Sequence, residues 1–144
     1  MPAPKFSTFE SKNRSKPKRR YTLAEANRAL PLVTRIVRDI VNSHERATQL
    51  QAKIEELPSG KDSASAQTQL DSALDRLQDY VDELSALGVE LKDYETGLID
   101  FTGRHEGRDV CLCWKLGEEK VAHWHEIHAG FAGRQSASKL RESE

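Results

Sequence analysis

The chain has 144 residues and a net charge of −1, and it is 37% hydrophobic, 6% aromatic and 31% charged. This length fits about one domain, and the small apolar fraction argues against a single thick globular core and for exposed helices that share a narrow seam. No run of about 18 apolar residues is present, so we expect no membrane-spanning helix, and the N-terminal residues lack the apolar stretch of a secretory signal.

The charge is unevenly distributed along the chain. Residues 1–20 contain seven basic residues and one acidic residue, so they carry +6 and the remainder carries −7. Because this segment is rich in Pro, Ser and Lys and has little to bury, we expect a basic disordered tail. The alternative is a contact with the phosphates of a nucleic acid, driven by the release of counterions.

The two cysteines, Cys111 and Cys113, are separated by one residue. A disulfide between them would strain the backbone. We therefore expect free thiols and a reducing, cytoplasmic setting.

A capping box at Thr22 and Glu25 predicts the start of a first long helix. Apolar or small residues then recur in steps of three and four, which indicates a coiled-coil-like seam. These residues are Leu23, Ala26, Leu30, Val33, Val37 and Ile40, then Ala47 after the polar His44, and Ile54 after the polar Gln51. Pro31 interrupts the pattern and predicts a kink, or a restart of the helix with Pro31 in its first turn.

A second helix is predicted after a break at residues 57–63, with Asp62 or Ser63 as its N-cap and Gly88 as its stop. Its apolar face contains Leu70, Leu74, Leu77, Val81 and Leu84. The short break makes the two helices antiparallel neighbours, a hairpin over residues 21–87. The first arm would be about 40 Å long, so part of the hairpin should project or be covered by another chain.

After residue 88 the periodicity becomes that of extended structure. Four short runs rich in β-formers, separated by glycines, predict a small antiparallel sheet of three or four strands. The runs are Val89–Lys92, Leu98–Phe101, Val110–Leu116 and Val121–Glu126. The expected fold is therefore α+β: a long antiparallel helical hairpin, then a small antiparallel β-sheet in residues 88–135 packed at the hairpin base, and a polar tail at residues 136–144.

Several motifs carry a resemblance to a known family. They are Gly97-Leu98-Ile99-Asp100-Phe101, Leu112-Cys113-Trp114, Trp124-His125-Glu126 and Gly130-Phe131-Ala132-Gly133-Arg134-Gln135, with YTLAEANRALPLV near the start. Over roughly residues 21–135 the chain resembles the bacterial family catalogued as domain of unknown function 2203. The resemblance implies a fold and a set of positions, and it implies no activity. The basic tail, Cys111 and His123 lie outside the matching motifs.

Candidate metal ligands gather near the C-terminal end of the predicted sheet. Thiolates and imidazoles are the ligands of tetrahedral zinc and of softer transition metals. The candidates are Cys113 and His125, completed by Cys111, His123 or His128. The Cys-x-Cys and His-x-His spacings are not the usual ones of zinc modules, and the competing interpretation is a buried cysteine beside a hydrogen-bonded histidine.

The register of the last predicted hairpin decides whether Cys113 and His125 share a face. A loop of two or four residues places Cys113 opposite Trp124, and the thiols and imidazoles then point to opposite faces. A three-residue loop, Glu118–Lys120, pairs Cys113 with His125 and keeps the other face more consistently apolar, so it is the favoured register.

Two further features suggest contacts rather than catalysis. Asp100 is an acid among apolar neighbours that could orient a histidine or Arg134, or face solvent. Arg134 and Gln135 follow two glycines and could bind an anion or a partner; this loop consists of Gly130, Phe131, Gly133, Arg134 and Gln135. The competing interpretation is a tight turn in which Phe131 fills the core.

The sequence favours a non-enzymatic interaction or regulatory module that uses the hairpin and the Gly130–Gln135 loop, with a protein partner or a second copy as its target and without membrane contact. The alternative is a metal-binding protein or metalloenzyme centred on Cys113 and His125, with zinc or another transition metal as cofactor. A cysteine nucleophile with a histidine base is chemically feasible, but no third orienting residue can be identified beside the pair. An enzymatic role is therefore less favoured.

Overall fold

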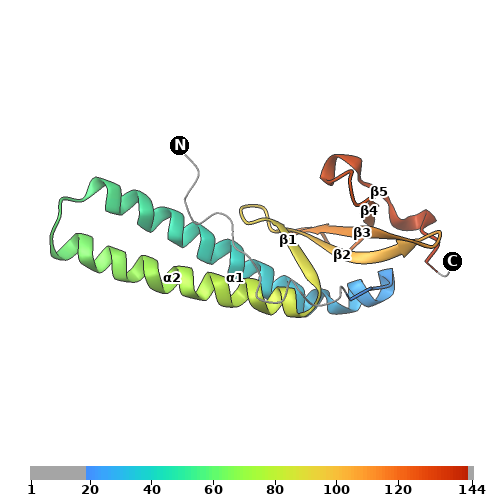
Figure 1. Cartoon of the computed structure of the whole chain (residues 1–144), viewed down its shortest axis with the longest axis horizontal. Helices are drawn as coiled ribbons and strands as arrows, with labels where there is room; N and C mark the ends of the chain where they lie inside the picture. Colours follow the sequence, from blue (N-terminus) through green and yellow to red (C-terminus); the bar gives the residue numbers. More distant parts are fainter. Residues whose placement is uncertain (1–18, 143–144) are drawn as a thin grey trace.

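The computed structural model describes residues 19–142, so most of the expected basic tail lies outside the described residues. Two helices come first, α1 (Leu23–Glu56) and α2 (Lys61–Ala86). The strands are β1 (Val89–Asp93), β2 (Leu98–His105), β3 (Arg108–Lys115), β4 (His123–His125) and β5 (Gln135–Ser136). Two 3-10 helices, η1 (Phe131–Gly133) and η2 (Ala137–Lys139), flank β5. The predicted α+β class and the helical hairpin are confirmed (Figure 1).

The helix ends follow local chemistry in part. The capping box is present, with Glu25 N–H donating to Thr22 Oγ1 at 3.0 Å and Thr22 N–H donating to the Glu25 carboxylate at 2.8 Å. Gly88 has a φ of +80° and donates its N–H to Ser85 O at 2.8 Å, which ends α2 as predicted. The predicted N-cap of α2 is wrong, because Gly60 is the N-cap. Asp62 lies in the first turn, where its negative charge interacts favourably with the helix dipole.

The predicted restart at Pro31 is also wrong, because α1 is one helix from Leu23 to Glu56 with Pro31 inside it. Proline in a helix interior costs about 3 kcal/mol. Here its ring is exposed, while Leu30 and Val33 beside it are buried in the core. Packing on both sides of Pro31 therefore outweighs the lost hydrogen bond.

The hairpin projects beyond the sheet (Figure 1). The half near the sheet shares one core with it, in which Ile36, Ile40 and Leu77 of the helices join Phe101 and Trp114 of the strands. The projecting half has a separate, smaller core, formed by Ala47, Leu50, Leu70 and Ala73 with Ile54 and Leu74 against it. The apolar stripe of α1 is wide because its near half packs on both α2 and the sheet.

The sheet is an antiparallel meander in the order β1-β2-β3-β4-β5. β2 and β3 are joined by a two-residue turn, Glu106-Gly107, with positive φ at both positions. β2 runs through Gly103, which the sequence placed between strands: a Cβ there would lie 2.7 Å from the Leu112 side chain, so glycine permits close packing inside the strand.

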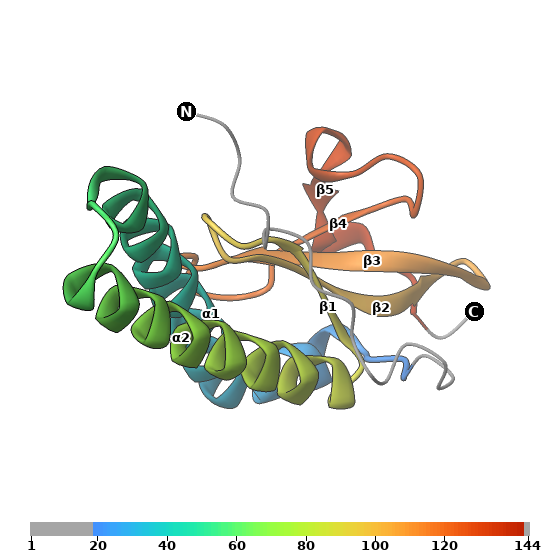
Figure 2. The same ribbon diagram turned by 60° about the vertical axis from the view of Figure 1, so that its left-hand side comes forward.

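The two faces of the sheet differ in chemistry. Phe101, Leu112 and Trp114 belong to the core shared with the helices. Figure 2 shows the helices on one side of the sheet and the connection from β4 to β5 on the other. Because neighbouring strand residues point to opposite faces, Asp100 and Cys113 lie on the side away from the helices. No helix in the described part of the chain combines the length and apolarity needed to cross a membrane.

The favoured register of β3 and β4 is wrong by two residues. Cys113 pairs with His123 and Cys111 with His125, because the connection between the strands spans residues 116–122 rather than three residues. The Asn27 side chain holds this connection, accepting from Val121 N–H at 2.8 Å and donating to Val121 O at 3.1 Å. A shift of two residues preserves the face, so the thiols and imidazoles still share one side.

Candidate metal centre

Three buried side chains from adjacent strands converge on the face of the sheet away from the helices. They are Asp100 of β2, Cys113 of β3 and His125 of β4, and one ligand atom of each lies within 4.8 Å of the other two. Asp100 is 4% exposed, Cys113 0% and His125 3%. Asp100 and Cys113 are directly opposite in the register, while His125 is two residues beyond Cys113's own cross-strand partner. The imidazole therefore reaches diagonally across β3 to the carboxylate.

Both ring nitrogens of His125 are engaged. Nδ1 lies 2.7 Å from Glu126 O and Nε2 lies 3.1 Å from Asp100 Oδ1. Because a carbonyl oxygen only accepts hydrogen bonds, Nδ1 carries a proton. The contact between Nε2 and the carboxylate is then a hydrogen bond only if a further proton lies between them. This geometry leaves Nε2 as the nitrogen that faces the carboxylate and the thiol.

Cys113 is a protonated thiol in this environment. Burial and, second, the nearby Asp100 carboxylate raise its pKa to about 11, although Arg134 partly opposes the rise. A thiol with this pKa is a weak nucleophile at neutral pH. The raised pKa of Cys113 therefore does not favour the nucleophile–base pair considered from the sequence.

The segment between β4 and β5, residues 126–134, is anchored at its end beside this cluster. Arg134 donates to both oxygens of Glu118 at 2.6 and 2.8 Å, and lies 3.4 Å from Cys113 O. Its guanidinium also stacks on the Phe131 ring, 4.6 Å from the centroid. Phe131 is 44% exposed, so it does not fill the core. Burial raises the pKa of Glu118, but its hydrogen bonds to Arg134 and to Lys115 N–H outweigh this, and the pKa is lowered.

The other candidate ligands lie outside the three-residue cluster. Cys111 is opposite His125 on the same face and is half-buried. His123 is opposite Cys113, and its Nδ1 is buried without a hydrogen-bond partner within residues 19–142. His128 is exposed on the segment 126–134. Glu126 forms an ion pair with Arg108, at 2.6 Å.

Sequence reasoning anticipated one part of this arrangement and missed two others. Orienting a histidine was one of the roles expected of Asp100, and its Oδ1 lies 3.1 Å from His125 Nε2, but Asp100 was not counted among the candidate metal ligands. Glu118 was treated as a loop residue, although it receives Arg134 and the Lys115 N–H at 2.8 Å. The glycines have a local role: Gly130 has a φ of +66°, and a Cβ on Gly133 would lie 2.6 Å from Ala129 Cβ.

Comparison with known proteins identifies a family. The model of the family described as Uncharacterized conserved protein (DUF2203) matches residues 19–137. The matched span includes both helices, all five strands and the three clustered residues. No curated protein and no solved structure matches the chain.

Proposed function

The chain belongs to the DUF2203 family of uncharacterized conserved proteins, and we propose that it is a metal-binding protein that holds one zinc-class divalent ion between Asp100, Cys113 and His125. The observation that carries this proposal is the convergence of three different buried donors, from three adjacent strands, within 4.8 Å of one another. Buried polar groups of this kind are commonly paired or bound to a metal.

The donor types indicate the class of ion. A thiolate favours zinc and softer transition metals, whereas magnesium and calcium take oxygen ligands. Zinc lies about 2.0–2.1 Å from nitrogen and oxygen ligands, which places tetrahedral ligand atoms about 3.3–3.4 Å apart. The observed distance of 3.1 Å between His125 Nε2 and Asp100 Oδ1 is close to that value.

The hydrogen bond from His125 Nδ1 to Glu126 O supports the same proposal. Histidines that bind metals usually donate their other ring N–H to a carbonyl or carboxylate, which fixes the tautomer and the ring orientation. Nε2 is thereby directed toward the two other donors without any change of backbone.

Charge balance is also favourable. A divalent ion bound by the Asp100 carboxylate, the Cys113 thiolate and a neutral His125 forms a site without net charge, which suits a buried position. Binding would displace the thiol proton and would need an unprotonated Nε2 on His125. A reducing cytoplasmic setting belongs to this proposal, because both cysteines are free thiols.

The test is the metal content of untagged, full-length protein prepared without chelator. We expect close to one equivalent of zinc, iron or a similar ion by elemental analysis, and recovery of one zinc equivalent after chelation and reloading. Asp100→Asn and His125→Gln should each lose that equivalent, whereas Cys111→Ser should keep it. Parent protein that binds no zinc in competition with a weak chromophoric chelator would contradict the proposal.

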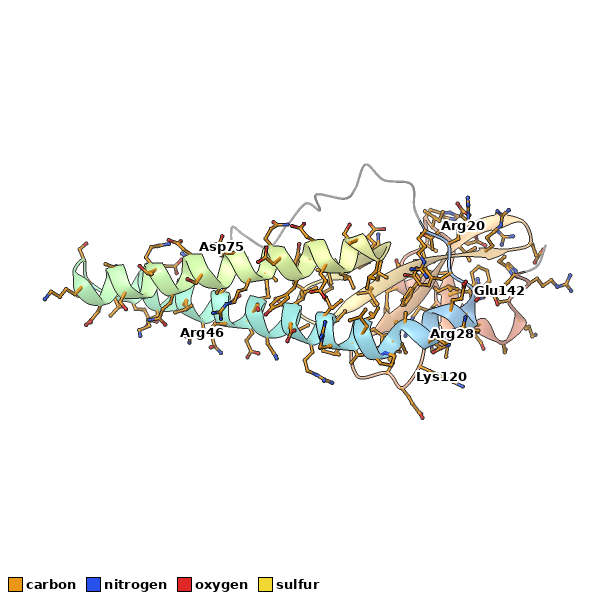
Figure 3. All side chains as sticks on the ribbon, turned by 90° about the horizontal axis from the view of Figure 1, so that it is seen from below. Arg20, Arg28, Arg46, Asp75, Lys120 and Glu142 are labelled. Atoms are coloured by element: carbon orange, nitrogen blue, oxygen red, sulfur yellow. The ribbon has the colours of Figure 1, made fainter. Side chains whose placement is uncertain are left out.

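A second function, an interaction module, is supported by a different observation. Of the three large apolar side chains that are exposed within residues 19–142, two lie on one short segment: Ile127 at 60% and Phe131 at 44%. The projecting hairpin also offers exposed charged side chains, including Arg46 and Asp75 (Figure 3). We propose self-association through residues 126–134 as its simplest form. Light scattering should then give a dimer mass for the parent and a monomer mass for Ile127→Ser, and a monomeric parent would exclude it.

A further inference from the structure

We propose that His123 is a fourth protein ligand, so that the metal centre is a closed structural site rather than an open catalytic one. This inference rests on the proposed binding of metal by Asp100, Cys113 and His125. Structural zinc sites have four protein ligands, whereas catalytic sites keep one position for water or substrate. The identity of the fourth ligand therefore decides which kind of site this is.

The position of His123 is the first observation. It is the direct cross-strand partner of Cys113, on the same face of the sheet. Side chains in such pairs have Cβ atoms about 4.5–5.5 Å apart. The row Asp100–Cys113–His123 thus crosses β2, β3 and β4 in order, with the central thiol between the carboxylate and the second imidazole.

The state of the His123 ring is the second observation. Nδ1 is buried and has no hydrogen-bond partner among the described residues. Buried polar side-chain atoms without a partner are unusual and call for an explanation. An imidazole nitrogen that carries no proton has a lone pair, so a bound cation would supply the partner that this buried atom lacks.

The burial of the centre is the third observation. The three converging residues are at most 4% exposed, and Arg134 hydrogen-bonds to the Cys113 carbonyl from the segment 126–134. A site for a substrate needs an accessible position on the metal, and these residues provide no accessible surface for one. A fourth ligand from within the sheet is consistent with this enclosure.

The other candidate ligands are less well placed. His128 is exposed on the segment beyond β4. Cys111 pairs with Thr102 and His125, so it lies two residues along β3 from the row Asp100–Cys113–His123. His123 is not within 4.8 Å of all three converging residues. Ligation therefore requires rotation about its side-chain bonds, which staggered alternatives make available.

The consequence is a metal cross-link between three strands. β4 has only three residues, His123–His125, and two of them would bind the ion. The ion would join β4 to β2 and β3, and would stabilise the base of the segment 126–134. The inferred role is to maintain the C-terminal half of the fold, with no substrate bound at the metal.

The test compares His123→Gln with the matched control His128→Gln in the full chain. In cobalt-loaded parent protein we expect the intense visible bands of a tetrahedral site with sulfur coordination. His123→Gln should weaken those bands and reduce zinc affinity about 100-fold or more, since loss of an outer partner alone costs 10–100-fold. His128→Gln should match the parent in both measurements.

X-ray absorption of the zinc-loaded parent provides a measurement that does not depend on a variant that folds. The expected result is two imidazoles, one sulfur and one oxygen ligand. A single imidazole ligand would overturn the closed site and leave the proposed metal function intact. The same would follow if His123→Gln bound zinc as tightly as the parent does and the cobalt spectrum shifted on addition of azide. A parent that binds neither zinc nor cobalt would overturn both.

Discussion

Replacement of Cys113 by serine separates a metal site from a packed cysteine. The side chain is fully buried, and serine nearly preserves its volume while offering a poor ligand to soft metals. In metal-free protein the new buried hydroxyl should cost about 1–3 kcal/mol of the free energy of unfolding. In the parent, zinc at 100 to 1,000 times its Kd adds about 2.7–4.1 kcal/mol. With zinc present, the two proteins should therefore differ by about 4–7 kcal/mol.

The assay is thermal and urea unfolding of both proteins, each with excess zinc and with chelator. Zinc should raise the melting temperature of the parent by on the order of 10 °C, and that of Cys113→Ser by much less. Cys111→Ser is the control, because Cys111 lies on the same strand and face but outside the cluster. An equal zinc-dependent increase in the parent and in Cys113→Ser would refute the assignment of Cys113 as a ligand.

Four further predictions follow from the same geometry. The pKa of Cys113 is about 11, so its proton must leave when zinc binds. Zinc affinity measured by chelator competition should therefore fall at least about tenfold for each pH unit below neutrality. A zinc affinity that does not change with pH would exclude a thiolate ligand. Glu118→Gln should cost about 1–3 kcal/mol in urea unfolding at pH 7. The pKa of Glu118 is lowered in the folded state, so this stability difference should be fully present above the pKa of Glu118 in the unfolded chain. It should vanish as the pH falls through the pKa of Glu118 in the folded protein. A difference that persists at pH 3 would show that the carboxylate charge is not its cause. Leu77 is fully buried, so Leu77→Asp should lower the free energy of unfolding by at least about 3 kcal/mol. The exposed control Asp75→Ala should change it by less than about 0.5 kcal/mol. Equal free energies of unfolding for the two variants would place Leu77 outside the seam. Removal of residues 1–18 should leave the melting temperature unchanged and abolish any salt-sensitive binding to nucleic acid, and a binding curve identical to the parent's would show that the tail is not involved.

The helical part of the fold could be predicted from local information. The capping box at Thr22, the repeating apolar seam and the stop at Gly88 act over three or four residues, so they are visible in the sequence. Pro31 could not be judged in this way. Its cost is local, but the packing of Leu30 and Val33 that outweighs it comes from α2 and the sheet.

For the candidate site, the sequence determined that Cys111 and Cys113 share one face of their strand, and that His123 and His125 share one face of theirs. The alternation of β3 and β4 places Cys111, Cys113, His123 and His125 at odd positions, so any even shift of register keeps them together. The choice among those shifts belongs to the tertiary structure, because the Asn27 side chain of α1 holds Val121 and thereby sets where β4 begins. Asp100 joins the cluster for a similar reason: it approaches Cys113 only through the pairing of β2 with β3. The sequence supplied the candidate ligands, whereas contacts between distant segments decided which of them meet.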